Sequence, residues 1–287
     1  MTRDLQSPVK IFLDDGVRIH VTDRGSGPAT LLVHGFTGSV EAWGEEILSA
    51  LTEAGRRVLA VDLPGHGRSD TPPDPGRYEL RRVARDLTVV LDRLEIARAD
   101  WVGYSMGGRL ALGAAVLHPD RVGRLVLEGA SPGIEGDAEA EERRTADEEL
   151  ARRILAGGME RFVEEWMARP IFRSRSRLPA PRLEAERNRR LAGDPRGLAN
   201  TLRGLGTGHQ PSFWSDLSRV RTPTLLLTGA EDEKFTGIAG RMAESLPRAV
   251  GVTVPRAGHT VHLERPRAWL AEVTAFLVDR VSSRTIR

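Results

Sequence analysis

Residues 101–112 read WVGYSMGGRLAL, in which a short apolar run leads through Gly103-Tyr104-Ser105-Met106-Gly107 into a helix-forming segment. A G-x-S-x-G pentapeptide between a strand and a helix is typical of a tight turn that projects a serine hydroxyl above a sheet, because its glycines avoid Cβ clashes. Five-residue matches also occur by chance, but the flanking strand and helix patterns make a purely structural turn the weaker interpretation. The stretch therefore predicts a reactive serine at a strand end.

Apolar runs that resemble this strand recur along the chain, separated by longer segments with helical spacing. The six runs lie at 30–34, 56–62, 99–105, 123–129, 223–229 and 249–255. Several carry Val and Leu without polar alternation, as expected for strands that are covered by helices on both faces. Helical spacing is found at 78–95, 109–119 and 269–281. The alternation predicts an α/β fold with a mostly parallel sheet.

One long segment interrupts this alternation. Strand patterns stop after 131–133 and resume at 221–229, and the residues between them are strongly charged and helix-forming. A block of this size between two strands is best interpreted as a helical cap over the carboxyl edge of the sheet. We therefore expect a cap at 131–220, inserted into a core that is formed by 1–130 and 221–287.

Composition narrows the class of protein. The 287 residues are 40% hydrophobic and 29% charged and include no cysteine, which excludes disulfides, thiolate metal sites and cysteine nucleophiles. Neither a signal peptide nor a run of about 20 apolar residues is found, so we expect a cytoplasmic protein without a membrane partner. The net charge is only +2, and all 42 basic residues except Lys10 and Lys234 are arginines. So small a net charge argues against a nucleic-acid partner.

A reactive serine needs a base, and the base needs an acid that orients it. In this type of fold the order along the chain is serine, acid, histidine. Asp232 follows the run 223–229 and is the preferred acid over Glu231 and Glu233; Glu128, at an earlier strand end, is a rival. His259 follows Gly258 just beyond the last strand and is the preferred base. Other histidines are expected to be structural or on the surface, namely His262, His118 and His209.

The glycine-rich loop after the first of these strands, His34-Gly35-Phe36-Thr37-Gly38, is a candidate oxyanion loop. We expect the backbone N–H groups of Phe36 and Met106 to hold a developing oxyanion. A second loop at 62–69 is rich in turn residues and is interpreted as mainly structural.

Arg109 raises a separate question, since it lies four residues after Ser105 on the same helix and an ester substrate would give it nothing to bind. It is either a solvated or paired arginine or a bidentate clamp for a substrate carboxylate, and its position alone leaves these equal. The composition of the cap favours the clamp, because residues 168–190 hold eight arginines and only two glutamates. Arg143 and Arg144 add another pair. Trp166 either forms an aromatic wall of the site or packs inside the cap.

The motifs taken together resemble the 2-succinyl-6-hydroxy-2,4-cyclohexadiene-1-carboxylate synthase family of menaquinone biosynthesis, which has the α/β-hydrolase fold. The resemblance extends from about residue 28 to 275 and is found in VGYSMGGRLAL, LEGASPG, EERRTADEELARRI, FVEEWMARPIF, LRGLGTGHQPSFW, GAEDEKF and PRAGHTVHLE. It implies catalytic roles for Ser105, Asp232 and His259. It also implies substrate-binding roles for Arg109, Arg143, Arg187, Tyr104 and Trp166.

The resemblance further implies a reaction, the elimination of pyruvate from a cyclohexene that carries three carboxylates, without cofactor or metal. This tricarboxylate is the expected small-molecule partner, and the chain is expected to be a monomer or a homodimer. Two other functions stay open. A carboxylesterase or carbon–carbon bond hydrolase would use the same three residues, and a ligand receptor could have kept the fold without catalysis.

Overall fold

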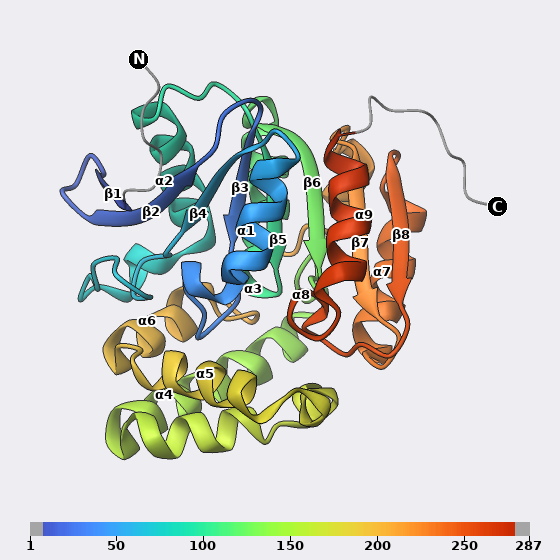
Figure 1. Cartoon of the computed structure of the whole chain (residues 1–287). Coiled ribbons are helices and arrows are strands. Elements are labelled where there is room, and N and C mark those ends of the chain that lie inside the picture. Colours follow the sequence, from blue (N-terminus) through green and yellow to red (C-terminus); the bar gives the residue numbers. More distant parts are fainter. Residues whose placement is uncertain (1–7, 279–287) are drawn as a thin grey trace.

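The computed structural model describes residues 8–278, whose strands form one sheet in the order β1-β2-β4-β3-β5-β6-β7-β8 (Figure 1). Strand β2 pairs antiparallel with β1 and β4, and every other pairing among the described strands is parallel. The strands are β1 Pro8–Phe12, β2 Arg18–Arg24, β3 Ala29–Val33, β4 Arg57–Val61, β5 Ala99–Tyr104, β6 Val122–Glu128, β7 Thr224–Gly229 and β8 Ala249–Val254. The predicted mostly parallel α/β fold is confirmed; residues 1–7 and 279–287 of the expected core lie outside the described residues.

Helices cover both faces of this sheet, which explains the unbroken apolar runs (Figure 1). Along β3, Leu31 and Val33 face one core cluster and Leu32 faces the other. The first cluster includes residues of α2 (Leu80–Arg93), α3 (Met106–Leu117) and α7 (Glu233–Ser245). The second includes residues of α1 (Gly44–Glu53), α8 (Val261–Glu264) and α9 (Pro266–Val278).

Strands β1 and β2 were not among the six strands that the apolar runs predicted. Strand β2 has the sequence RIHVTDR, in which polar side chains interrupt the apolar ones. Its place next to the edge of the sheet, antiparallel to β4, allows this pattern, because a strand near an edge does not need apolar side chains on both faces. Short mixed runs of this kind carry a weak sequence signal.

Between β6 and β7 the chain forms helices alone, which Figure 1 shows as a separate layer beside one edge of the sheet. These are α4 (Asp137–Met167), the 3-10 helix η4 (Pro170–Arg177), α5 (Ala180–Leu191), α6 (Pro195–Leu205) and the 3-10 helix η5 (Trp214–Arg219). Helix α4 bends at Gly158, whose φ is 75°. Apolar residues of α4 and α6 form a third core cluster, so this layer, here called the lid, has its own packed interior. No helix within 8–278 is long and apolar enough to cross a membrane.

A buried carboxylate organises much of the lid's charge. Glu186 on α5 is 3% exposed and forms ion pairs with Arg189 and Arg190, and Arg175 of η4 lies 3.9 Å from it. Burial would raise the pKa of Glu186, but the three arginines outweigh it and lower the pKa from 4.5 to about 2. The ionised carboxylate therefore stabilises the folded lid at neutral pH.

Glu186→Gln should destabilise the protein by about 3 kcal/mol near pH 7, because glutamine cannot balance three buried guanidiniums. Since the pKa is lowered in the folded state, the contribution of Glu186 is complete above pH 4.5 and is lost as the pH falls toward 2. The gap in unfolding free energy between wild type and variant should therefore narrow on acidification, as measured by urea unfolding between about pH 6 and about pH 3. Glu184→Gln, an exposed position on the same helix, is the control, and a gap independent of pH would contradict this account.

Candidate active site

Backbone contacts at the turn between β5 and α3 require both glycines of the motif. A Cβ at Gly107 would lie 2.0 Å from the carbonyl oxygen of Val33, and one at Gly103 would lie 2.3 Å from that of Gly107. Ser105, between them, has φ 52° and ψ −110°, a conformation that costs a non-glycine residue about 1–3 kcal/mol. The helix and sheet thus approach so closely that the serine is held in a strained turn at the sheet edge.

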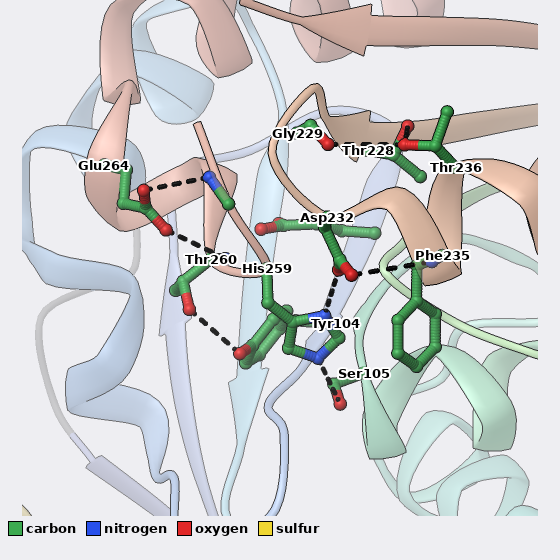
Figure 2. Close-up of polar contacts among 12 residues, drawn as sticks. Tyr104, Ser105, Thr228, Gly229, Asp232, Phe235, Thr236, His259, Thr260 and Glu264 are labelled. Atoms are coloured by element: carbon green, nitrogen blue, oxygen red, sulfur yellow. Dashed lines mark hydrogen bonds and ion pairs between the residues drawn. The ribbon is translucent and has the colours of Figure 1, made fainter. Parts of the chain in front are cut away.

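Three side chains that lie far apart in the sequence meet at this turn (Figure 2). The Nε2 atom of His259 lies 3.0 Å from Oγ of Ser105, and its Nδ1 lies 2.6 Å from Oδ2 of Asp232. His259 and Asp232 are 4% and 8% exposed. The chain of hydrogen bonds gives the serine a base and gives the base an orienting carboxylate, the arrangement needed to activate a hydroxyl.

The loops that carry these two residues are held by contacts on both sides. Asp232 caps the N-terminus of α7, where its Oδ1 accepts a bond from the N–H of Phe235. Glu264, at the end of α8, accepts bonds from the N–H groups of Gly258 and Thr260, the two neighbours of His259 (Figure 2). The sequence analysis did not identify Glu264. The only signal was its position five residues after the histidine.

The rival acid, Glu128, faces the other side of the sheet. Its carboxylate accepts bonds from the backbone and Nδ1 of His262 and from the indole Nε1 of Trp269, and the side chain is fully buried. It therefore has no contact with His259 and is a structural anchor for α8 and α9. His262, expected to be structural, belongs to this network.

A cavity of about 570 Å³ lies between the sheet edge and the lid, and Ser105 and His259 both line it. Phe36 and Met106, the candidate oxyanion residues, line it as well. No backbone bond among the described residues uses the N–H of either one. Most of the remaining wall is apolar or cationic, with acidic side chains at the start of α4.

Arg109 projects into this cavity from α3. Its Nη1 donates to Oε1 of Gln210 at 2.6 Å, and no carboxylate within the described part of the chain forms an ion pair with it. Burial lowers the pKa of Arg109 to about 10, with a further decrease from the nearby Arg143, opposed by Asp147. The group stays charged at neutral pH, so it is a part-buried cation with a neutral partner.

Two other predicted residues reach the cavity and resolve alternatives that the sequence left open. Arg143 lines it while bonding Asp147 through Nε, whereas Arg144 donates to the carbonyl of Gly208 and is not part of the wall. Trp166 lines the cavity and also packs against Phe162 in the lid interior, so both of its proposed roles hold.

Tyr104 and Arg187, expected from the resemblance to bind substrate, are not among the residues that line the cavity. Tyr104 is the last residue of β5 and points into the second core cluster, where its hydroxyl bonds Oγ1 of Thr260 (Figure 2). Arg187 is exposed on α5, because Glu186 and Arg190, four residues apart, define the buried face of that helix. For both residues the expected place is therefore corrected.

The structure adds Arg169 to the wall, a residue that the sequence analysis counted among the lid arginines without singling it out. Other arginines of that run contact acidic residues of the protein instead: Arg175, Arg189 and Arg190 contact Glu186, and Arg177 contacts Glu231. No group of three or more His, Cys, Asp or Glu residues suited to a metal ion is found within 8–278.

The fold and the serine site define an enzyme of the α/β-hydrolase superfamily, and the family model described as alpha/beta hydrolase fold matches residues 28–266. A protein of Bacillus subtilis strain 168, provisionally named 2-succinyl-6-hydroxy-2,4-cyclohexadiene-1-carboxylate synthase, is 41% identical over 94% of this chain and 98% of its own. The chain belongs to the family of these synthases.

Two solved structures extend the comparison. MenH from S. aureus has a TM-score of 0.86 at 31% identity, over 90% of this chain and 97% of its own. A thermophilic esterase from Thermogutta terrifontis, solved with malate bound, has a TM-score of 0.82 at 27% identity, over 94% of this chain and 98% of its own.

Two nearly isosteric substitutions separate the two candidate acids. Asp232→Asn should lower kcat by about 10³- to 10⁴-fold, because an amide neither holds the required tautomer of His259 nor stabilises its protonated form. Glu128→Gln should keep kcat within about threefold and lower the free energy of unfolding by about 1–3 kcal/mol. Both values are measured on one substrate that the wild type turns over, beside urea unfolding. The assignment fails if Glu128→Gln loses activity and Asp232→Asn keeps it.

Proposed function

We propose that this chain is a lyase that eliminates pyruvate from 2-succinyl-5-enolpyruvyl-6-hydroxy-3-cyclohexene-1-carboxylate and forms 2-succinyl-6-hydroxy-2,4-cyclohexadiene-1-carboxylate. The observation that carries the proposal is Arg109, a part-buried guanidinium that shares a cavity with the Ser105 hydroxyl. Among the described residues it bonds only the neutral Gln210. Leaving a cation in this state costs free energy unless an anion binds there. A neutral ester would leave that cost uncompensated, whereas a substrate with three carboxylates would not.

The triad would supply the base of the reaction. Ser105, whose proton passes to His259, removes the proton from the carbon beside the succinyl ketone. Negative charge then moves onto the ketone oxygen, which the N–H groups of Phe36 and Met106 would stabilise. The electrons return to the ring as the carbon–oxygen bond to the enolpyruvyl group breaks, giving the conjugated diene. His259 then gives the proton that it took from Ser105 to the departing enolate, which becomes pyruvate.

The cationic side chains would fix the substrate's orientation. Arg109 follows Ser105 by one helical turn, and Arg143 approaches the same cavity from the lid. Guanidinium groups bind carboxylates through two parallel bonds, so they set orientation as well as affinity. Such positioning places the acidic proton against the hydroxyl, which can contribute several kcal/mol to catalysis.

A carboxylesterase or carbon–carbon bond hydrolase is the second candidate, favoured by the similarity to the Thermogutta terrifontis esterase. The same three residues would then form an acyl-enzyme or activate water. A non-catalytic receptor is weakened by the complete hydrogen-bonded chain from Ser105 to Asp232, since a receptor needs no such chain.

Ser105→Ala should abolish pyruvate release, because the variant lacks the hydroxyl that removes the proton, while the protein stays folded. Pyruvate is measured with lactate dehydrogenase and NADH, and folding by circular dichroism. Wild type should hydrolyse p-nitrophenyl acetate poorly in comparison. Strong ester hydrolysis without pyruvate release would favour the esterase.

Arg109→Met keeps an unbranched side chain, shorter than that of arginine, and removes its charge. We expect KM to rise roughly 10- to 100-fold, the loss expected for a charged hydrogen bond, with a smaller effect on kcat. The free energy of unfolding should stay equal or increase, because the unpaired cation is removed. Arg109→Lys, which keeps the charge without the planar fork, should recover part of the affinity. An unchanged KM together with a large loss of stability would mark Arg109 as structural.

A further inference from the structure

We propose that Arg169 is the third guanidinium of the substrate site and binds a carboxylate of the tricarboxylate substrate. This is the role that the resemblance implied for Arg187. The inference rests on the proposed function, because it assigns a residue to that substrate. It starts from the position of Arg169 in the wall of the cavity that also holds Ser105 and Arg109.

The backbone around Arg169 is fixed by its neighbours. Helix α4 ends at Met167, and the N–H of Arg169 donates to the carbonyl oxygen of Trp166 at 3.3 Å. Pro170 follows, and a residue before proline is restricted to extended conformations, in agreement with φ −61° and ψ 142° for Arg169. The side chain thus leaves a rigid turn at the junction of α4 and η4.

Stacking then orients the guanidinium. Its Cζ lies 4.2 Å from the centroid of the Trp166 ring. That ring is held in turn by Phe36, Phe162 and Phe172, with centroid distances of 5.1, 5.7 and 5.8 Å. A stacked guanidinium uses its face, so the N–H groups at its edge stay available for a carboxylate. The indole Nε1 of Trp166 is a further buried donor without a partner among the described residues.

Arg169 has no directly bonded acidic partner among the described residues. Its guanidinium forms no hydrogen bond or ion pair with any residue of the described range, in contrast to the arginines that contact Glu186. Burial lowers the pKa of Arg169, and Arg143 and Arg153 lower it further, while the carboxylates of Asp147 and Glu165 oppose this shift. Arg143 also lowers the pKa of Arg109. Arg143 therefore acts on both groups, and these three guanidiniums line one cavity, whose wall also includes Lys234 and Arg241. Arg241 forms an ion pair with Glu135. The acidic residues that line the cavity are Glu135, Glu139 and Glu142, and none of them forms an ion pair with Arg109 or Arg169.

Three of the guanidiniums that line the cavity, those of Arg109, Arg143 and Arg169, match the three carboxylates of the proposed substrate in number. Three guanidiniums repel one another in the free protein, and three carboxylates would neutralise them in the complex. Arg169 stacks on Trp166, which packs against Phe36, the candidate oxyanion residue. Arg109 approaches from the helix after Ser105. Carboxylates would thus be held on two sides of the reacting centre.

The main test compares three arginine-to-alanine variants in the pyruvate-release assay. Arg169→Ala should raise KM roughly 10- to 100-fold and change kcat much less, since the lost contact is made both before and in the transition state. Arg173→Ala is the control, because Arg173 is an exposed arginine of the same lid segment. Arg187→Ala should resemble this control. Equal KM values for wild type and Arg169→Ala, or the loss appearing in Arg187→Ala instead, would overturn the inference.

A binding measurement keeps the inference separable from the proposed reaction. Propane-1,2,3-tricarboxylate, which cannot react, should raise the unfolding temperature of wild type and of Arg173→Ala but not of Arg169→Ala. If wild type releases no pyruvate, the proposed function fails, and this measurement alone decides the inference. The absence of stabilisation in wild type, or equal stabilisation in Arg169→Ala, would overturn it. Should Arg169→Ala not fold, Arg169→Gln takes its place in both experiments.

Discussion

The site depends on one backbone contact, the approach of Gly107 to the carbonyl oxygens of Val33 and His34. No side chain fits there, since a Cβ would lie 2.0 Å from the first oxygen and 2.5 Å from the second. This contact places the start of α3 against the end of β3, and three consequences follow. Ser105 is held in its strained conformation, the N–H of Met106 lies beside the loop of Phe36, and Arg109 is carried one turn further into the same cavity.

Arg109 and the lid arginines divide into two groups according to their partners. Arg175, Arg189 and Arg190 pair with the single carboxylate of Glu186, which offsets part of their charge and stabilises the lid. Arg109 and Arg169 form no ion pair in the part of the chain that the structure describes, whereas Arg143 pairs with Asp147. Uncompensated charge at a site lowers stability and favours an anionic ligand, a common cost of function. The arrangement agrees with a protein whose lid must fold before substrate arrives.

Several contacts connect the lid to the residues around the reacting groups, among them the packing of Phe172 against the His259 ring. On one side Trp166 packs on Phe36, so the lid touches the loop proposed to hold the oxyanion. On the other side Arg175 donates to Oγ1 of Thr260, next to His259, and Thr260 also bonds the hydroxyl of Tyr104. Any shift of the lid would therefore disturb both the loop of Phe36 and the loop of His259.

The sequence by itself determined the features that depend on local pattern. Apolar runs gave the parallel sheet, the interruption at 131–220 gave a helical segment, and motif order named the three residues that the structure joins by hydrogen bonds. Only the tertiary structure decided which side chains share a cavity. It placed Glu128 away from the triad, Arg187 outside the cavity and Arg169 in the cavity wall. It also showed that Glu264 holds the loop that carries His259. The reason is physical: composition shows that arginines are present, but their direction depends on which helix face is buried and which carboxylates lie nearby.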